Sequence, residues 1–138
     1  MQTDKLAIEL GYQLYNRAII SIDGQIQTEE KAPWLILDVK VYAGGFEGTI
    51  SDYASIGHLI SFADELEHLY QELRGTAVFG TIDGKFSVEI LGDGKGHIRA
   101  KFDVMDDIAR LKFDADFDQT FLPNLIKQIR AIPSTYLT

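Results

Sequence analysis

The chain has 138 residues, no cysteine and a formal net charge of −8 at pH 7. This length fits a single domain covering residues 1–138, and a hydrophobic content of 46% is that of a globular protein rather than a disordered one. The lack of cysteine excludes disulfides and thiolate chemistry, which favours a cytoplasmic location. Phosphate binding depends on Lys and Arg, so the charge argues against a nucleic acid ligand. We expect neither a signal peptide nor a membrane span, which needs about 18 consecutive apolar residues.

The first part of the chain has the alternating pattern of β-strands. Apolar and polar residues alternate in four segments, which predicts strands at residues 6–10, 17–23, 34–42 and 46–50. A polar loop is expected at residues 28–33, and Gly44-Gly45 predicts a turn between the last two strands. Because the long strands lie in hairpins, we expect an antiparallel sheet.

Two later segments change to a helical period. Apolar residues recur every three or four positions over residues 55–74, which predicts a helix with Ser55 as its N-cap. Gly75 fits the position after the helix that needs left-handed backbone. A second helix is expected to begin near Thr120 and to end at Pro133. Each helix has one apolar stripe, so each needs the apolar face of the sheet as its partner.

Between the helices, three turn signals connect four further strands. Asp83-Gly84 is the strongest short hairpin signal, and we expect a two-residue turn with positive φ at both positions. The glycine-rich segment 92–96 and a short turn near Asp106-Asp107 reverse the chain again. Pairing residues around these turns keeps one face apolar throughout. The expected fold is therefore α+β, an antiparallel sheet of about seven or eight strands with two helices packed on one face.

No motif points to a specific chemistry. Asp64, His68 and Glu72 follow one another at intervals of four residues on the first helix, so they form a stripe that could bind a divalent metal. Strong helical metal motifs pair two His or use facing helices, so we interpret these three residues as a solvated polar face. Serines, histidines and acids have no spacing typical of a nucleophile or zinc protease. We predict no catalytic, cofactor-binding or metal-binding residue and no enzyme, although a site assembled only by the fold stays open as the alternative.

Two other patterns are interpreted as structural. Asp114, Asp116 and Asp118 are similar to the start of a calcium loop, but the glycine and the glutamate that such a loop requires later are missing. Their alternation with apolar residues predicts the outward face of a strand, with Asp114 opposite Arg99. The segment 92–96 leads into a strand rather than a helix N-terminus, so we expect a hairpin turn and not a phosphate site.

A set of turn and core motifs extends over roughly residues 17–132. These motifs are Pro33-Trp34-Leu35, Gly45-Phe46-Glu47-Gly48, the helix at residues 62–73, Gly75, Gly96-His97-Ile98 and Asp118-Gln119-Thr120. In this order they resemble the WapI-type immunity proteins and related small bacterial families without an assigned function. The resemblance implies a small cytoplasmic protein that binds and neutralises a cognate toxin domain, and it implies no catalytic residues.

A binding protein with this charge suggests a basic partner, such as a basic toxin domain. The most acidic contiguous segment runs from the short strand at 46–50 into the first helix. We expect partner contact there, at Glu47, Asp52, Asp64, Glu65, Glu67 and Glu72. Two alternatives stay open: a solvated face that only keeps the protein soluble, and a ligand-binding or enzymatic domain. The oligomeric state is not specified by the sequence.

Overall fold

The computed structural model describes residues 6–26 and 33–136, so nearly all of the expected polar loop at 28–33 lies outside the described residues. The elements follow the order β1 (Ala7–Leu10), β2 (Arg17–Ile26), β3 (Trp34–Ala43), β4 (Phe46–Ser55), α1 (Ile56–Glu72), β5 (Arg74–Gly80), β6 (Phe86–Asp93), β7 (His97–Met105), β8 (Arg110–Asp118), the short 3-10 helix η1 (Gln119–Phe121) and α2 (Leu122–Tyr136). The expected α+β class is confirmed.

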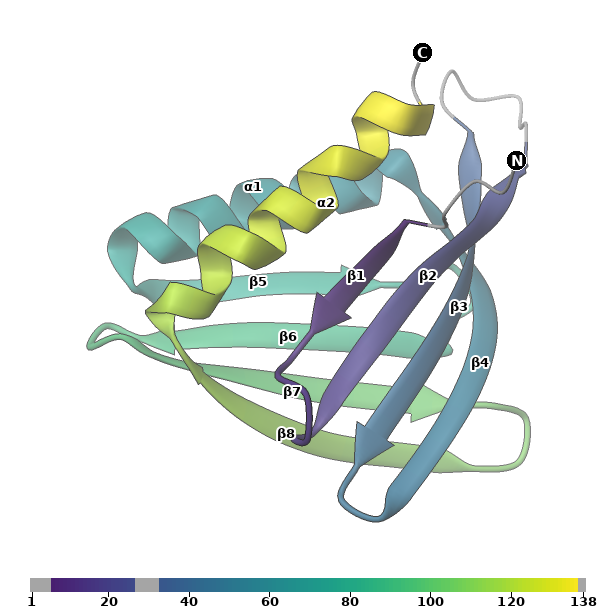
Figure 1. Cartoon of the computed structure of the whole chain (residues 1–138), viewed down its shortest axis with the longest axis horizontal. Helices are drawn as coiled ribbons and strands as arrows, with labels where there is room; N and C mark the ends of the chain where they lie inside the picture. Colours follow the sequence, from purple (N-terminus) through teal and green to yellow (C-terminus); the bar gives the residue numbers. More distant parts are fainter. Residues whose placement is uncertain (1–5, 27–32, 137–138) are drawn as a thin grey trace.

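The strands form two antiparallel sheets rather than one. Their orders are β1-β2-β3-β4 and β5-β6-β7-β8, so every strand pairs with its neighbour in the chain. Figure 1 shows the two sheets crossing, with α1 and α2 side by side; α1 contacts β5 and α2 contacts β1. The single expected sheet is divided where α1 leaves β4 and leads into β5. Two sheets can bury their apolar faces against each other, whereas a single open sheet depends on the helices to cover its apolar face.

One hydrophobic core holds both sheets and both helices together. Alternate residues of β3 point inward and are at most 1% exposed: Leu35, Leu37, Val39 and Val41. The helices contribute the expected stripes, which include Leu59, Phe62, Leu66 and Leu69 from α1 and Leu122, Leu125, Ile126, Ile129 and Ile132 from α2. Apolar area removed from water stabilises a fold by about 25 cal/mol per Å². This shared core, rather than any one hairpin, therefore fixes which side chains face the solvent.

The helix ends confirm one expected cap and correct two other predictions. Ser55 is the N-cap of α1, since its Oγ accepts a hydrogen bond from the His58 N–H at 3.1 Å. The left-handed C-cap is Leu73, with φ of 59°, and not Gly75, which already belongs to β5. Helix α2 also continues through Pro133 to Tyr136. Proline removes only one N–H donor, and the neighbouring Ile132 is 1% exposed, so α2 is still packed on the core where Pro133 occurs.

The hairpin of β5 and β6 has the expected register but a different turn. Phe79 pairs with Val88, as pairing around Asp83-Gly84 requires. Gly84 has a positive φ of 73°, whereas Asp83 does not have a positive φ. The prediction of positive φ at both positions is therefore wrong for Asp83.

Asp52 explains the shape of this turn and joins the two sheets at one corner. Its side chain is 3% exposed, and its carboxylate accepts hydrogen bonds from the backbone N–H groups of Asp83 and Lys85, at 3.2 Å each. The Tyr53 N–H donates to the same carboxylate at 2.8 Å. Beside it, the Ile82 N–H donates to the carbonyl of Tyr53 at 2.8 Å. The turn is therefore shaped by β4 as well as by its own residues.

The pairing of β7 and β8 differs from the expected register by two residues. Arg99 lies opposite Asp116 rather than Asp114. The connection is longer than a two-residue turn, because the Asp106 carboxylate accepts hydrogen bonds from the N–H groups two and three residues further on, at 2.8 and 2.7 Å. Shifting a strand by two residues leaves the same side chains on the same face. The apolar pattern therefore could not distinguish the two registers.

Replacing Gly84 with Val should lower the free energy of unfolding by about 1 kcal/mol or more, because a β-branched residue is strained at positive φ. A Cβ at Gly84 would have Met105 Cε as its nearest neighbour, at 3.8 Å, so the effect comes from the backbone rather than from a clash. Gly45→Val is the matched control, since Gly45 lies in a turn, has no positive φ and has open space around it. Equal melting temperatures for the two variants would contradict this prediction.

Replacing Asp52 with Asn should destabilise the protein and change its response to acid. Burial raises the pKa of Asp52, but hydrogen bonds from Thr81, from the Tyr53 N–H and from the turn lower it by more, so the pKa lies below its ordinary value. The ionised carboxylate therefore contributes stability at neutral pH, and this contribution is lost as the pH falls through the folded-state pKa. We expect the free energy of unfolding to fall by about 1–3 kcal/mol at pH 7. Below about pH 4, the stability of the variant should decrease less steeply with falling pH than that of the wild-type protein.

Chemical denaturation between pH 3 and pH 7 measures this effect, with the exposed Asp107→Asn as the control variant. Parallel stability curves for the wild-type protein and Asp52→Asn would show that the carboxylate does not support the corner between the sheets.

Candidate functional site

The structure separates the six acidic residues that were expected to contact a partner. Four of them are exposed on α1: Asp64, Glu65, Glu67 and Glu72. Glu47 is exposed beside the turn between β3 and β4, at the other end of the molecule from α1 (Figure 1). Asp52 is buried, and its carboxylate is occupied by the β5–β6 turn. Acidic residues that are neighbours in the sequence therefore do not form one continuous surface.

Part of the charge on α1 is compensated within the molecule. Arg130 of α2 donates a hydrogen bond to Asp64 at 2.7 Å and lies 3.1 Å from Glu67. These interactions, with the Asp64 bond first, raise the pKa of Arg130. The Glu65 carboxylate accepts a hydrogen bond at 2.8 Å from the Val78 N–H of the edge strand β5. Three of the four carboxylates thus already help to hold α1 against α2 and β5.

The expected polar face at Asp64, His68 and Glu72 does not assemble into a compact set of ligands. Asp64 is paired with Arg130, while His68 and Glu72 border a surface hollow together with Arg74. Across residues 6–26 and 33–136, no group of three or more His, Cys, Asp and Glu residues is placed to hold a metal ion. None of the helices in that part of the chain is long and apolar enough to cross a membrane.

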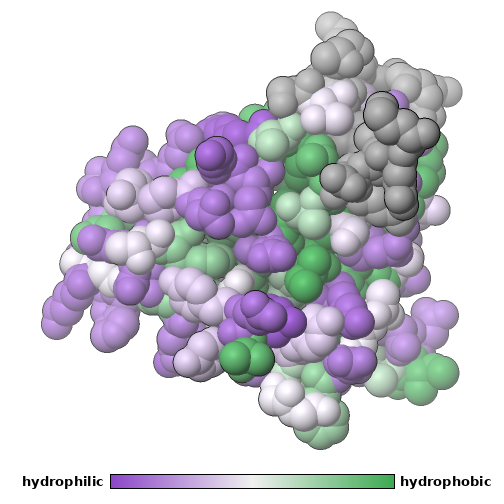
Figure 2. Space-filling model, viewed as in Figure 1, coloured by the Kyte–Doolittle hydropathy of each residue, from purple (hydrophilic) through white to green (hydrophobic). Residues whose placement is uncertain are grey.

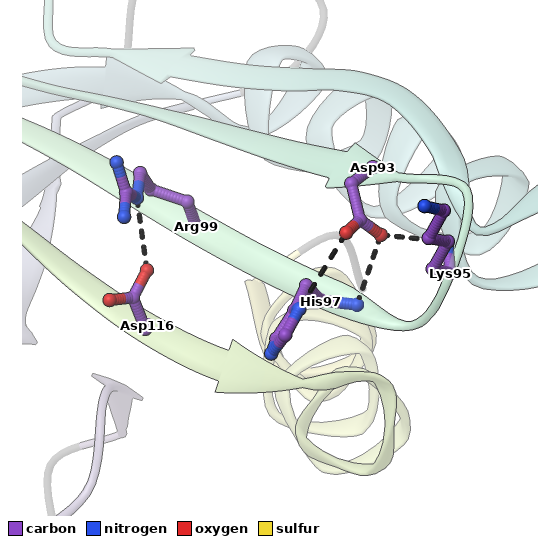
Figure 3. A network of polar contacts seen from close by, with 5 residues as sticks. All are labelled: Asp93, Lys95, His97, Arg99 and Asp116. Carbon is purple, nitrogen blue, oxygen red and sulfur yellow. Dashed lines mark hydrogen bonds and ion pairs between the residues drawn. The ribbon is translucent and has the colours of Figure 1, made fainter.

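The turn between β6 and β7 belongs to a polar network on the outer face of the second sheet (Figure 3). The Asp93 carboxylate accepts hydrogen bonds from the N–H groups of Lys95 and His97, at 2.7 and 3.2 Å. The bond from Lys95 is the main cause of a lowered Asp93 pKa. Arg99 Nε donates to Asp116 at 2.9 Å. The N–H groups of this glycine-rich segment therefore bind a carboxylate of the chain itself, as a hairpin turn requires.

A groove lies beside this network, between the β1–β2 loop and the edge strand β8. It has a volume of about 550 Å³ and is lined by Tyr12, Tyr15, His97, Asp116, Phe117 and Asp118. The Tyr12 ring packs edge-on against Phe117 and Phe121, with ring centroids 5.5 and 5.1 Å apart. Tyr12 is therefore held in place by the core, whereas Tyr15 is 71% exposed.

Asn16 fixes the β1–β2 loop at this end of the molecule. Its Oδ1 accepts a hydrogen bond from the Gly44 N–H in the β3–β4 turn, at 2.9 Å. Its Nδ2 donates to the Asp114 carbonyl of β8, also at 2.9 Å. The loop is thus tied both to its own sheet and to the second sheet.

Large apolar side chains are exposed in the β1–β2 loop and at the start of β4. They are Tyr12, Leu14, Tyr15 and Phe46, with exposed fractions of 41, 91, 71 and 72%. We call these four residues the aromatic end, and Figure 2 shows hydrophobic groups at the lower end of the molecule, where these two segments lie. Clustered apolar exposure marks interaction surfaces, and tyrosine is enriched in binding hot spots. Sequence reasoning missed this surface because its two segments are far apart in the chain.

Leu14 has a φ of 76°, a left-handed conformation that disfavours any residue with a Cβ. Glycine adopts this conformation without strain, so Leu14→Gly should raise the free energy of unfolding by about 0.5–1 kcal/mol. Leu14→Ala keeps the Cβ and should give no such gain, which makes it the matched control. Thermal unfolding of both variants tests this, and a Leu14→Gly protein that is no more stable than Leu14→Ala would contradict it.

Comparison with known proteins gives a family and a fold. Two solved structures are similar. The plant transcriptional regulator PBF-2 has a TM-score of 0.55 and 10% sequence identity, and the match covers 99% of this chain and 85% of that chain. WHY3 from Arabidopsis thaliana has a TM-score of 0.52 and 14% sequence identity, and the match covers 99% of this chain and 91% of that chain. At such low identity, these similarities concern the fold alone. A search of curated protein sequences gives no significant match. The profile of the Immunity protein WapI-like family matches residues 3–136, nearly the whole chain. The chain therefore belongs to the WapI-like immunity protein family.

Proposed function

We propose that this chain binds a toxin domain and neutralises it by occupying its surface, without catalysing a reaction. The observation that carries this proposal is the family match over nearly the whole chain. An immunity protein of this kind acts where it meets the toxin inside the producing cell, so we place its action in the cytoplasm. The lack of cysteine in the sequence fits that location.

The charge of the chain supports a basic toxin domain as the partner. The formal net charge is −8, and two of the four carboxylates on α1, Asp64 and Glu67, share one guanidinium, that of Arg130. An uncompensated negative field accelerates the approach of a positively charged protein. We propose that Asp64, Glu65, Glu67 and Glu72 attract the partner over a distance, since three of them are already bound within the protein. Glu47 belongs to the other end of the molecule, and buried Asp52 takes no part.

The direct test uses the C-terminal domain of the polypeptide encoded immediately upstream of this gene. Its expression alone should stop bacterial growth, and co-expression of this chain should restore growth. Size-exclusion chromatography should then show a complex of the two proteins. A domain that is not toxic, or a toxic domain that this chain neither binds nor blocks, would overturn the proposal.

The role of the charge on α1 predicts a specific salt dependence. Asp64→Asn combined with Glu72→Gln should slow association with the toxin domain several-fold at about 0.01 M ionic strength, where the Debye length is about 30 Å. The effect should nearly vanish at about 0.15 M, where that length is about 8 Å. Asp107→Asn combined with Glu89→Gln removes the same charge elsewhere and serves as the control.

Stopped-flow association rates measure both double variants. An unchanged rate for the α1 variant at low salt would contradict steering by α1. Equal slowing by the control would show that only the net charge matters.

A further inference from the structure

We propose that the groove between the β1–β2 loop and β8 receives a Lys or Arg side chain of the toxin domain, while the aromatic end forms the apolar part of the same interface. This inference rests on the proposed function and deepens it, because it assigns the docking surface and the chemistry of the anchoring side chain.

Aromatic rings and carboxylates converge in this groove. Tyr12 and Tyr15 come from the β1–β2 loop, and Asp116 and Asp118 come from β8. A cation placed over a tyrosine face is attracted by the ring, and a carboxylate beside it adds a charge-assisted hydrogen bond. The chain already uses the first of these interactions close by, where the Arg17 guanidinium carbon lies 4.0 Å from the centroid of the Tyr42 ring.

The groove retains negative charge that its neighbours do not cancel. Asp118 accepts its hydrogen bonds from Thr120 through Oδ1, which leaves Oδ2 without a partner among the described residues. The pKa of Tyr12 is raised by burial and by the Asp118 carboxylate, so the negative charge of Asp118 acts on a side chain that lines the groove. A positively charged side chain would relieve this field.

The cations near the groove leave it accessible. Arg99 binds Asp116 through Oδ1, but it borders a separate hollow of about 410 Å³ on the other side of that residue. His97 borders both hollows, and its Nδ1 lies 3.6 Å from the Asp93 carboxylate, outside the groove. Asp116 is thus paired with Arg99, while Asp118 has no cationic partner among the described residues, which favours a cationic guest.

The surroundings of the groove fit a protein surface better than a free small molecule. Leu14 and Phe46 are 91 and 72% exposed, so they can become buried only when a partner covers them. Among the described residues, no Lys or Arg lines the groove to bind the phosphates of a nucleic acid. A second copy of this chain would bring the same excess of carboxylates.

The groove can be tested without the toxin, by titrating the labelled protein with N-acetyl-arginine amide in NMR experiments. The amide signals of Tyr15, His97 and Asp116 should shift and saturate at millimolar concentration. N-acetyl-citrulline amide, which has nearly the same shape but no charge, should bind at least tenfold more weakly. Arginine amide that causes no saturable shift at these residues, or equal binding of both compounds, would overturn the proposal.

Matched variants extend the test to the toxin domain that the co-expression experiment identifies. Asp116→Asn and Tyr15→Ala should each weaken the complex at least tenfold. Asp114 lies two residues from Asp116 on the same strand face, so Asp114→Asn is the first control. The second is Ile108→Ala, which removes an apolar side chain that is 95% exposed, against 71% for Tyr15. Both controls should stay within twofold. Circular dichroism and melting temperatures verify that each variant is folded.

The outcomes separate this inference from the proposed function. A complex that forms and protects cells, but is unaffected by both groove variants, would overturn the docking site and leave the proposed function intact. Failure of the unmodified chain to bind would overturn the proposed function itself. Saturable binding of a single-stranded DNA 12-mer to the groove residues, or dimerisation of the chain through the groove, would assign the groove to another partner and overturn the proposal.

Discussion

Mutual burial of two apolar sheet faces is the constraint on which the rest of the structure depends. Each face belongs to a four-stranded meander, and the helices α1 and α2 contribute one apolar stripe each to the same core. Because strand side chains alternate, burying Ile98 and Phe117 turns Arg99 and Asp116 outward. The polar network of Figure 3 is thus a consequence of the core, and so is the groove that borders it.

Polar side chains join the two sheets at two corners where the apolar core ends. At one corner, the Asp52 carboxylate of β4 holds the turn between β5 and β6. At another, Asn16 bridges the β3–β4 turn and the β8 backbone. Both side chains satisfy backbone groups of hairpin turns, and Asn16 also satisfies a carbonyl of the edge strand β8. These contacts determine loop shape, and through it the position of the aromatic end.

The acidic helix and the aromatic end suit different tasks in recognition. Charges on α1 are exposed and partly paired, so in the function proposed above they act over a distance and depend on salt. The aromatic end offers large apolar groups beside carboxylates, a combination that suits close contact. The chain belongs to the WapI-like immunity protein family, and the shared fold extends to plant proteins of very low identity. The fold therefore acts as a scaffold on which surface residues specify the partner.

The sequence by itself determined the elements of this protein. Period-two alternation identified the strands, the stripe of α1 and Ser55 identified a helix and its start, and Asp83-Gly84 identified a hairpin with its register. These features are local, because each depends on residues a few positions apart. The motifs also identified the family, since turn and core positions are local too.

Tertiary structure alone decided how the elements combine. Only the fold brings Asp52 to the β5–β6 turn, and only close packing explains Gly92, where a Cβ would lie 2.6 Å from the Leu73 carbonyl oxygen. Likewise, the division into two sheets and the groove beside β8 depend on contacts between distant segments. Residue spacing determines local periodicity, but it does not determine which apolar faces pack against each other. The candidate site is made where those faces end, so it could be found only once the faces had been brought together.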